Sequence, residues 1–223
     1  MEIIWHGHSC FTIKDKGVTI VTDPYTNLGT KLPALKADVV TLSDELVFSE
    51  GNVAKVEGEP KIFSWPGEYE VKGIGIEGYN AFHFAKSAED EKNANCKIVI
   101  YNFFFNGYKI CHLSGLGHRL TSELTESIGD VDILLVPIGG NLVIDYKKAI
   151  EVIEQIEPKI VIPMYYKIPG SKLDIGGLDE FLKAVGKTTV EPLESFEVKK
   201  KEELPIDRTD YIILKPMLGI TAL

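Results

Sequence analysis

The stretch KADVVTLSDELVFSEGN, residues 36–52, places a short apolar run directly before a polar loop. Its central part, VVTLS at residues 39–43, is typical of a buried strand. The loop that follows begins with Asp44 and Glu45 and contains no histidine. This stretch therefore predicts a buried strand whose end offers carboxylates but no imidazole.

The sequence around this stretch predicts more short strands, at residues 1–5, 10–14, 18–22 and 61–64. Asp15, Lys16 and Gly17 separate the second and third of these strands and indicate a hairpin. A turn at Pro66-Gly67 precedes residues 71–83, where three glycines among isoleucines favour a bent strand. The polar segment 85–96 is expected to be a solvated loop.

The second half of the chain alternates strands with helices. Asn106-Gly107 joins strands 97–105 and 108–113 in a predicted hairpin. Thr121 and Asp145 are expected to cap helices that end at residues 128 and 156. Further strands are predicted at 131–138, 159–164, 190–198 and 211–214, with a helix at 178–185. This order predicts two sheets with helices outside them, in a single domain covering residues 1–223.

The composition excludes several classes of function. The 223 residues are 44% hydrophobic and 26% charged, which is typical of a soluble globular chain. A net charge of −9 argues against binding to nucleic acid, because phosphate contacts require clustered lysine and arginine. No apolar run approaches the roughly 20 residues that span a bilayer, and the first residues do not resemble a signal peptide. We therefore expect a cytoplasmic protein that contacts neither nucleic acid nor membrane.

The three cysteines, Cys10, Cys96 and Cys111, are widely spaced and form no Cys-x-x-Cys pair. This spacing indicates neither a disulfide framework nor a thiolate zinc site. The favoured interpretation is that Cys10 and Cys111 are buried, reduced and act as small apolar side chains. The alternative is a nucleophilic Cys111 beside His112, but neighbours in a strand point to opposite faces.

Several segments together resemble one known fold family. These segments are IIWHGHSCFTI, VTIVTDPY, LPALKADVVTLS, PGEYEVKGIGIEG, ICHLSGLGHRLT, VDILLVPIGG and AIEVIEQIEPKIVIPMYYK. Their order and spacing over about residues 1–215 resemble the metallo-β-lactamase fold, and within it the branch of metal-dependent hydrolases similar to L-ascorbate-6-phosphate lactonase. The resemblance implies an α/β architecture, a four-layer αββα sandwich with its site along one edge of the two sheets.

The resemblance also implies seven metal-ligand positions, and six of them are changed in this sequence. After the strand at 39–43 the family has His-x-His-x-Asp-His, and its later ligands are a His, a bridging Asp and a final His. The corresponding residues here are Asp44, Leu46, Phe48, Ser49, His83, Gly115 and Tyr165. Leu46 and Phe48 cannot coordinate a metal, and Gly115 has no side chain. The positions are thus vestigial, and we expect no metal cofactor or, at most, a single Zn or Mn ion.

Three functions remain open. The favoured one is a non-catalytic pseudoenzyme that has lost the dinuclear site and serves as a binding or structural subunit. The second is a hydrolase of the lactone or phosphoester class with a rebuilt mononuclear site, for instance from Asp44, Glu45, His83 and His118. The third is a metal-free domain that binds a small ligand in the old cleft. Apolar bulk at Leu46 and Phe48 argues against the second.

Other residues match family positions around the vestigial site. A residual cleft is predicted from His8, Asp23, His83, His118 and Tyr165, and it could bind a small anion or sugar-like ligand. The favoured interpretation, however, is that buried histidines and carboxylates at family positions are kept for hydrogen bonds that fix strand ends and turns. His6 lies outside the family signature, and we expect it to be exposed or satisfied locally.

The apolar tail PMLGITAL, residues 216–223, extends beyond the end of the resemblance. Terminal residues are poorly ordered unless something holds them, and an exposed apolar strand invites pairing. The tail is expected either to dock on its own domain or to join an interface. The interface would be that of a homo-oligomer or of a complex with an active relative.

Overall fold

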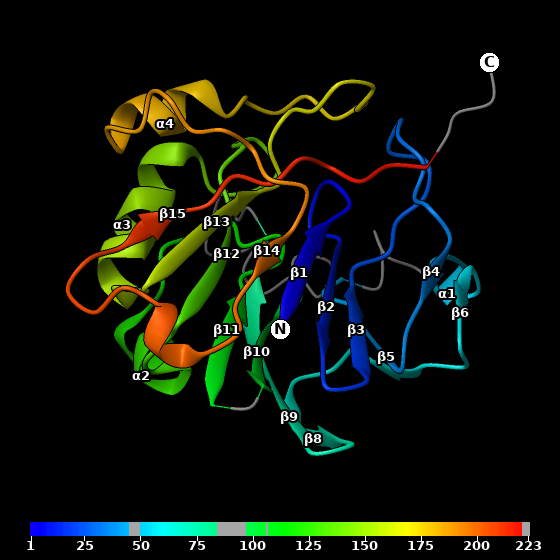
Figure 1. The fold of residues 1–223 in the computed structure, drawn as a ribbon. Helices are drawn as coiled ribbons and strands as arrows, with labels where there is room; N and C mark the ends of the chain where they lie inside the picture. The colour runs from blue at the N-terminus through cyan, green and yellow to red at the C-terminus, as the bar shows by residue number, and fades with distance from the viewer. Residues whose placement is uncertain (45–49, 84–96, 106, 220–223) are drawn as a thin grey trace.

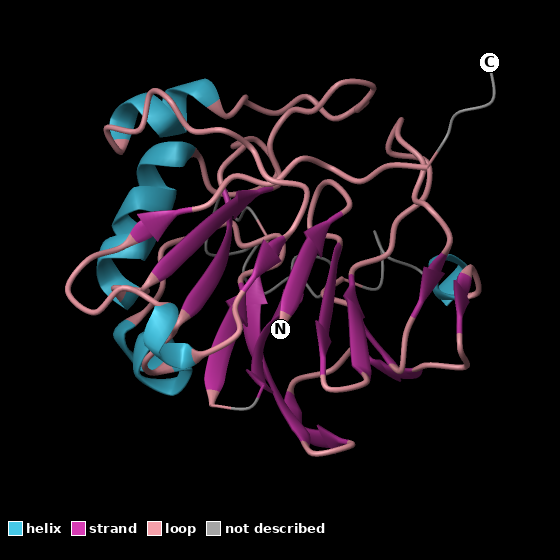
Figure 2. Cartoon of the chain, in the orientation of Figure 1, coloured by secondary structure: helices cyan, strands magenta, loops and turns pink. Residues whose placement is uncertain are grey.

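Two β-sheets face each other and enclose the core of the molecule (Figures 1 and 2). The computed structural model describes residues 1–44, 50–83, 97–105 and 107–219. One sheet consists, in spatial order, of β14 (Phe196–Glu197), β1 (Glu2–Trp5), β2 (Phe11–Asp15), β3 (Val18–Thr22), β5 (Val39–Thr41) and β7 (Lys61–Phe63). The other consists of β15 (Asp210–Tyr211), β13 (Ile160–Met164), β12 (Ile133–Pro137), β11 (Tyr108–His112), β10 (Lys97–Phe105), β9 (Ile74–Phe82) and β8 (Gly67–Val71).

Helices cover the outer sides of this pair of sheets. Beside the second sheet lie α2 (Ser122–Ile128), α3 (Tyr146–Ile156) and α4 (Asp179–Ala184), at the left in Figure 1. At the other end of the molecule, α1 (Glu50–Val53) lies beside a small sheet formed by β4 (Leu35–Lys36) and β6 (Val56–Glu57). A short 3-10 helix, η3, covers Lys201–Glu203. The predicted αββα sandwich class is confirmed. None of the described helices has the length and apolar character needed to cross a membrane.

Local sequence signals account for several of these elements. The β2–β3 hairpin turns at Lys16 and Gly17, whose φ angles are 44° and 83°, so both residues take the positive values that a type I′ turn requires. Thr121 caps α2 by accepting a hydrogen bond from the backbone N–H of Leu124 at 3.2 Å. Asp145 caps α3 in the same way through Lys148 N–H at 2.9 Å. Both predicted caps are confirmed.

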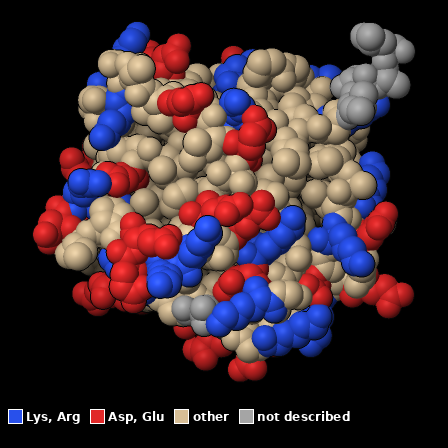
Figure 3. Space-filling model, viewed as in Figure 1, with Lys and Arg blue, Asp and Glu red and all other residues tan. Residues whose placement is uncertain are grey.

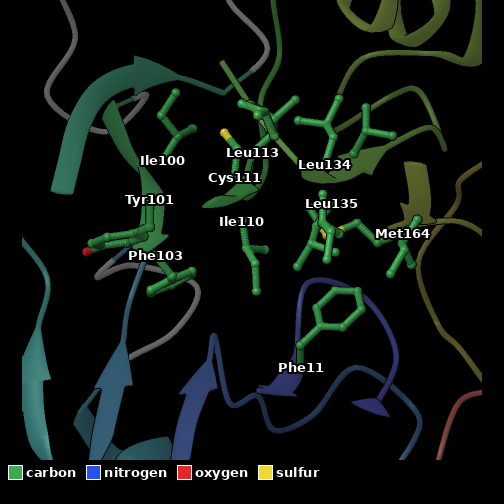
Figure 4. Packing of buried hydrophobic residues seen from close by; sticks show 14 of the residues in the cluster. Phe11, Ile100, Tyr101, Phe103, Ile110, Cys111, Leu113, Leu134, Leu135 and Met164 are labelled. Atoms are coloured by element: carbon green, nitrogen blue, oxygen red, sulfur yellow. The ribbon is translucent and has the colours of Figure 1, made fainter. Parts of the chain in front are cut away.

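The core lies between the two sheets, where side chains from both inner faces interdigitate (Figure 4). Trp5 and Phe11 from one sheet and Tyr101 and Phe103 from the other are fully buried. Burial of such aromatic side chains contributes about 1.5–3 kcal/mol each through the hydrophobic effect. The continuous run IVIYNFFF in β10 is covered almost throughout, as its apolar character predicts.

Hydrogen bonds between the sheets fix the end of β5 against β10. The hydroxyl of Tyr101 donates to the carbonyls of Leu42 and Phe63 at 2.9 and 3.0 Å. The backbone N–H of Val99 donates to the carbonyl of Ser43 at 2.8 Å. Because β10 pairs with β9 in register, these contacts bring the loop after β5 close to the end of β9.

The strand predictions fail in three places. Gly67–Val71 forms strand β8, paired antiparallel with β9, where the sequence predicted only a turn and one bent strand. The predicted strand 190–198 is reduced to Phe196–Glu197, which pairs with Glu2 and Ile3 of β1. The predicted strand 211–214 is found at Asp210–Tyr211, where it pairs with β13. The elements β4, β6, α1 and η3 were not predicted, since two to four residues are too few to show a periodic pattern.

The tail docks on its own chain over residues 217–219. Met217 N–H donates to the carbonyl of Trp5 and Gly219 N–H to that of Lys31, both at 2.8 Å. The carbonyl of Met217 accepts a hydrogen bond from His6 Nδ1 at 3.0 Å. Of the two outcomes expected for His6, exposure is wrong, because the side chain is buried between the tail and Thr12, where both ring nitrogens have hydrogen-bond partners. Residues 220–223 of the predicted tail lie outside the described residues.

Candidate functional site

Five chain segments that each follow a strand contribute to one site at the edge of the two sheets. Asp23 follows β3, Asp44 follows β5, and His83 follows β9. Gly115 and Tyr165 come shortly after β11 and β13. The sequence positions are far apart, and the parallel pairing of β3 with β5 and of β12 with β11 and β13 aligns the strand ends. Glu45, Leu46, Phe48 and Ser49 lie outside the described residues.

Asp23 anchors the loop that carries Asp44. Its Oδ1 accepts the backbone N–H of Ser43 at 2.7 Å, and its Oδ2 accepts the Ser43 hydroxyl at 2.8 Å. Burial raises the pKa of Asp23 to about 7, and the neighbouring Asp44 carboxylate adds to this effect while the bonds from Ser43 oppose it. Asp23 therefore fixes Ser43, the residue directly before Asp44. The sequence predicted Asp23 in the cleft, but the role of Ser43 was not predicted, because only its position next to Asp44 suggests it.

The central contact of the site joins His83 to Asp44. His83 Nε2 lies 2.9 Å from Asp44 Oδ2, and His83 Nδ1 lies 2.8 Å from the carbonyl oxygen of Gly115. The carbonyl can only accept, so Nδ1 carries a proton. A neutral imidazole then directs the lone pair of Nε2 at the carboxylate, and a cation between the two atoms, either a proton or a metal ion, relieves that repulsion. Both side chains are largely buried, with exposed fractions of 17% and 4%.

The His83 ring lies in the space beside Gly115. A Cβ atom on residue 115 would overlap the Cε1 and Nδ1 atoms of His83. In the resembling family this position carries a bridging aspartate, so here the imidazole takes up space that such a side chain would need. Glycine in place of aspartate at position 115 therefore leaves room for the imidazole ring of His83.

Tyr165 lies at the position of the family's final histidine and is 2% exposed. Its φ angle is 54°, and its backbone N–H donates to the carbonyl of His8 at 3.1 Å. Burial, followed by the charges of Asp23 and Asp44, raises the pKa of the Tyr165 phenol. The phenol therefore stays protonated at neutral pH, which makes it a hydrogen-bond donor and a poor metal ligand. Its hydroxyl makes no hydrogen bond with the described residues.

The remaining predicted cleft residues are distributed around this centre. The buried His8 ring contacts Tyr165 and Tyr25 edge-on, with ring centroids 5.8 and 4.9 Å apart, and neither of its nitrogens has a hydrogen-bond partner among the described residues. Burial lowers the pKa of His8 to about 4, so its ring is neutral. His118 is half-buried, and its nitrogens contact the backbone of Phe82 and Arg119. His118 therefore supports the strand that precedes His83, with both ring nitrogens in contact with the backbone.

The donor set decides which metal centre the residues fit. Among the described residues, no group of three or more His, Cys, Asp or Glu side chains could hold a metal ion. Gly115 and Tyr165 supply no charged ligand, so the residues do not fit two ions. For one ion the described residues supply two donors, Asp44 Oδ2 and His83 Nε2, which lie 2.9 Å apart, and the Nδ1–H bond to a carbonyl is the usual support of a metal-binding histidine. A catalytic ion usually has about three protein ligands, so the pair forms part of such a set, and the neighbouring Glu45 and Ser49 lie outside the described residues.

The chain belongs to the beta-lactamase superfamily. The αββα sandwich with its site at one sheet edge defines the class, and the model of the beta-lactamase superfamily domain matches residues 2–165. A solved structure from Thermotoga maritima, described as a candidate Zn-dependent hydrolase of the metallo-β-lactamase superfamily, is 34% identical. The match covers 96% of this chain and 97% of that one, with a TM-score of 0.78. The predicted superfamily is confirmed; its branch near ascorbate-phosphate lactonase stays a prediction.

Curated relatives agree with this assignment. A UPF0173 protein from Pyrococcus abyssi is 27% identical over 219 residues, which cover 89% of this chain and all of the relative. A protein from Carboxydothermus hydrogenoformans, described as a UPF0173 metal-dependent hydrolase, is 26% identical over 213 residues, or 83% of this chain and 94% of the relative.

These descriptions overturn one prediction from the sequence. The favoured interpretation was a non-catalytic pseudoenzyme with a lost dinuclear site, but relatives that span nearly the whole chain are described as metal-dependent hydrolases. The prediction counted substituted positions and gave little weight to the two donors that remain. Asp44 and His83 still meet at the strand ends, so the substitutions alter the site without emptying it of chemistry.

Proposed function

We propose that this chain is a hydrolase of the lactone or phosphoester class that acts at the Asp44–His83 pair with a single Zn or Mn ion. The observation that carries the proposal is the 2.9 Å approach of His83 Nε2 to Asp44 Oδ2, with His83 oriented by the Gly115 carbonyl. Whole-chain similarity to proteins described as metal-dependent hydrolases supports the reaction class. Cytoplasmic placement is part of this proposal.

Each residue of the site has a separate role in the proposed hydrolysis. Asp23 holds Ser43 and so keeps the Asp44 carboxylate at the edge of the site. Gly115 fixes the tautomer of His83, which leaves Nε2 available toward the cleft. Tyr165 offers a neutral hydroxyl that can donate to the oxygen on which negative charge develops. When bound, the ion would acidify a water molecule and polarise the ester.

Hydrolysis assays with single substitutions test this proposal. The protein is purified without chelator and assayed on a panel of lactones and nitrophenyl phosphoesters, with added Zn²⁺, with added Mn²⁺ and after EDTA treatment. We expect metal-stimulated hydrolysis, and a loss of about a hundredfold or more in kcat/KM for His83→Ala and Asp44→Asn. His118→Ala is the matched control, because both ring nitrogens of this histidine contact backbone groups.

Metal content by plasma mass spectrometry gives a second readout that needs no substrate. We expect close to one equivalent of metal in the wild-type protein and in His118→Ala, and a clear reduction in His83→Ala. Hydrolysis that is absent across the panel, or equal in wild type and His83→Ala, would reject the proposed function.

A further inference from the structure

A cavity of about 430 Å³ lies beside the candidate site, between the loop that follows β3 and the segment from α1 to β6. This volume falls within the range of roughly 300–1,000 Å³ that is typical of small-molecule sites. Its wall begins at Pro24, directly after Asp23, and its far side is formed by Asn52 and Lys55. The cavity and Asp44 therefore lie on segments that follow the same two neighbouring strands, β3 and β5.

One buried side chain in this cavity lacks a hydrogen-bond acceptor. Asn52 is 5% exposed and lines the cavity. Its Oδ1 accepts a hydrogen bond from the Thr26 hydroxyl at 2.6 Å, which leaves the two N–H groups of Nδ2. These groups make no hydrogen bond with the described residues. Nδ2 is not one of the fully enclosed atoms without a partner, so its N–H groups are open to the cavity, where a ligand oxygen can accept hydrogen bonds from them.

The charges around the cavity indicate the sign of that ligand. Lys31 and Lys55 both line it, and neither forms an ion pair with the described residues. No described lining residue is acidic, although the whole chain has a net charge of −9. Two uncompensated ammonium groups and an amide donor are suited to phosphate or carboxylate oxygens. Leu35 and Val56 add an apolar wall that suits the carbon skeleton of the ligand.

We propose that this cavity binds a small organic anion with a phosphate or carboxylate group, through Lys31, Lys55 and Asn52. The bound phosphate or carboxylate group could belong to either of two molecules. It could be the non-reacting end of the substrate, or it could be part of a separate small anion. The first source rests on the proposed hydrolase function. The binding site itself does not, since it is built from residues other than Asp44 and His83.

Titration calorimetry with glycerol 1-phosphate tests the binding site, with glycerol as the neutral comparison. Lys31→Gln/Lys55→Gln removes both ammonium groups. Asn52→Asp keeps the size of the side chain and its bond from Thr26 but replaces the donor by a negative charge. Lys183→Gln/Lys187→Gln, in and just after α4, is the control with the same change in net charge. Circular dichroism confirms that each variant is folded.

We expect saturable one-to-one binding of glycerol 1-phosphate and no binding of glycerol. Affinity should fall about tenfold or more in both cavity variants and stay within about twofold in the control. No saturable binding to wild type, or equal binding to wild type and the lysine variant, would overturn the inference. Because the titration requires no turnover, binding without hydrolysis would reject the proposed function alone, and hydrolysis without binding would reject the cavity alone. Competitive inhibition of hydrolysis by glycerol 1-phosphate would identify the substrate as the source, and non-competitive inhibition a separate anion.

Discussion

The imidazole ring of His83 occupies the space that a side chain on residue 115 would need, and His83 is held there by a hydrogen bond to the Gly115 carbonyl. This relationship depends on a glycine at position 115. The hydrogen bond to Gly115 orients His83 toward Asp44, so the contact between these two side chains depends on the space beside residue 115.

Gly115→Ala should therefore damage both stability and activity. The added methyl group would force the ring of His83 away from Asp44, and overpacking of this kind costs about 1–3 kcal/mol. The free energy of unfolding is measured by urea denaturation and kcat/KM by the hydrolysis assay. Gly177→Ala is the control, because no atom lies within 4 Å of its added Cβ. Wild-type values for Gly115→Ala would show that the ring does not depend on this space.

Cys111 should be inert, although it neighbours His112 in sequence. Burial raises the pKa of the Cys111 thiol to about 12 and that of Cys10 well above its usual range, so neither forms a thiolate at neutral pH. The two side chains of residues 111 and 112 belong to successive positions of β11 and point to opposite faces. We expect Cys111→Ser to retain hydrolase activity, and both thiols to react with a maleimide reagent only after denaturation. Loss of hydrolysis in a folded Cys111→Ser protein would restore the nucleophile hypothesis.

Much of the fold could be predicted from sequence because its strands are long apolar runs bounded by turn residues. Strand β10 matches its predicted bounds of 97–105, and helix α3 has Ala149, Val152, Ile153 and Ile156 buried on the predicted face. Strand β8 was missed because Gly67 reads as a turn residue, and its strand character comes from pairing with β9. Pairing across a sheet is a tertiary effect that local propensity does not contain.

The candidate site was harder to predict than the fold. The sequence identified Asp44, Gly115 and Tyr165 as altered ligand positions and His83 as the retained one, and it grouped Asp44 with His83 only as one possible part of a rebuilt site. Asp44 and His83 are 39 residues apart, and only the packing of β5 against β10 brings their side chains together. The cavity containing Asn52 was missed for the same reason. Its polar side chains come from two loops that show no motif.

His112 should make stability depend on pH on the acid side. Burial lowers the pKa of this fully buried side chain to about 3, although its contact with the Ser9 carbonyl works in the other direction. The unfolded chain, with a pKa near 6.5, therefore binds protons that the folded state does not. The stabilisation is fully present above pH 6.5 and is lost progressively as the pH falls from about 6.5 to about 3, by up to roughly 3–5 kcal/mol.

Nuclear magnetic resonance measures this titration directly. We expect the Cε1 resonance of His112 to show no titration between pH 7 and pH 4.5 in the folded protein. His112→Gln, which keeps an N–H donor without a titrating ring, should reduce the loss of stability on acidification. A midpoint near pH 6.5 for the His112 resonance would contradict this account of its burial.

Two truncations separate the contribution of the docked tail from that of its last residues. Removal of residues 216–223 deletes the hydrogen bonds from Met217 N–H to Trp5 and from Gly219 N–H to Lys31, and it uncovers His6. Each such bond contributes about 0.5–1.5 kcal/mol, so we expect a loss of roughly 1–3 kcal/mol in unfolding free energy. Removal of residues 220–223 alone is the matched control, and it deletes none of these bonds.

Because Gly219 N–H binds the carbonyl of Lys31, a residue that lines the cavity, the longer truncation should also weaken binding of glycerol 1-phosphate there. Equal stability of the two truncated proteins would show that residues 216–219 add nothing to the fold. An oligomeric wild-type protein that becomes monomeric already when residues 220–223 are removed would place the end of the tail at an interface.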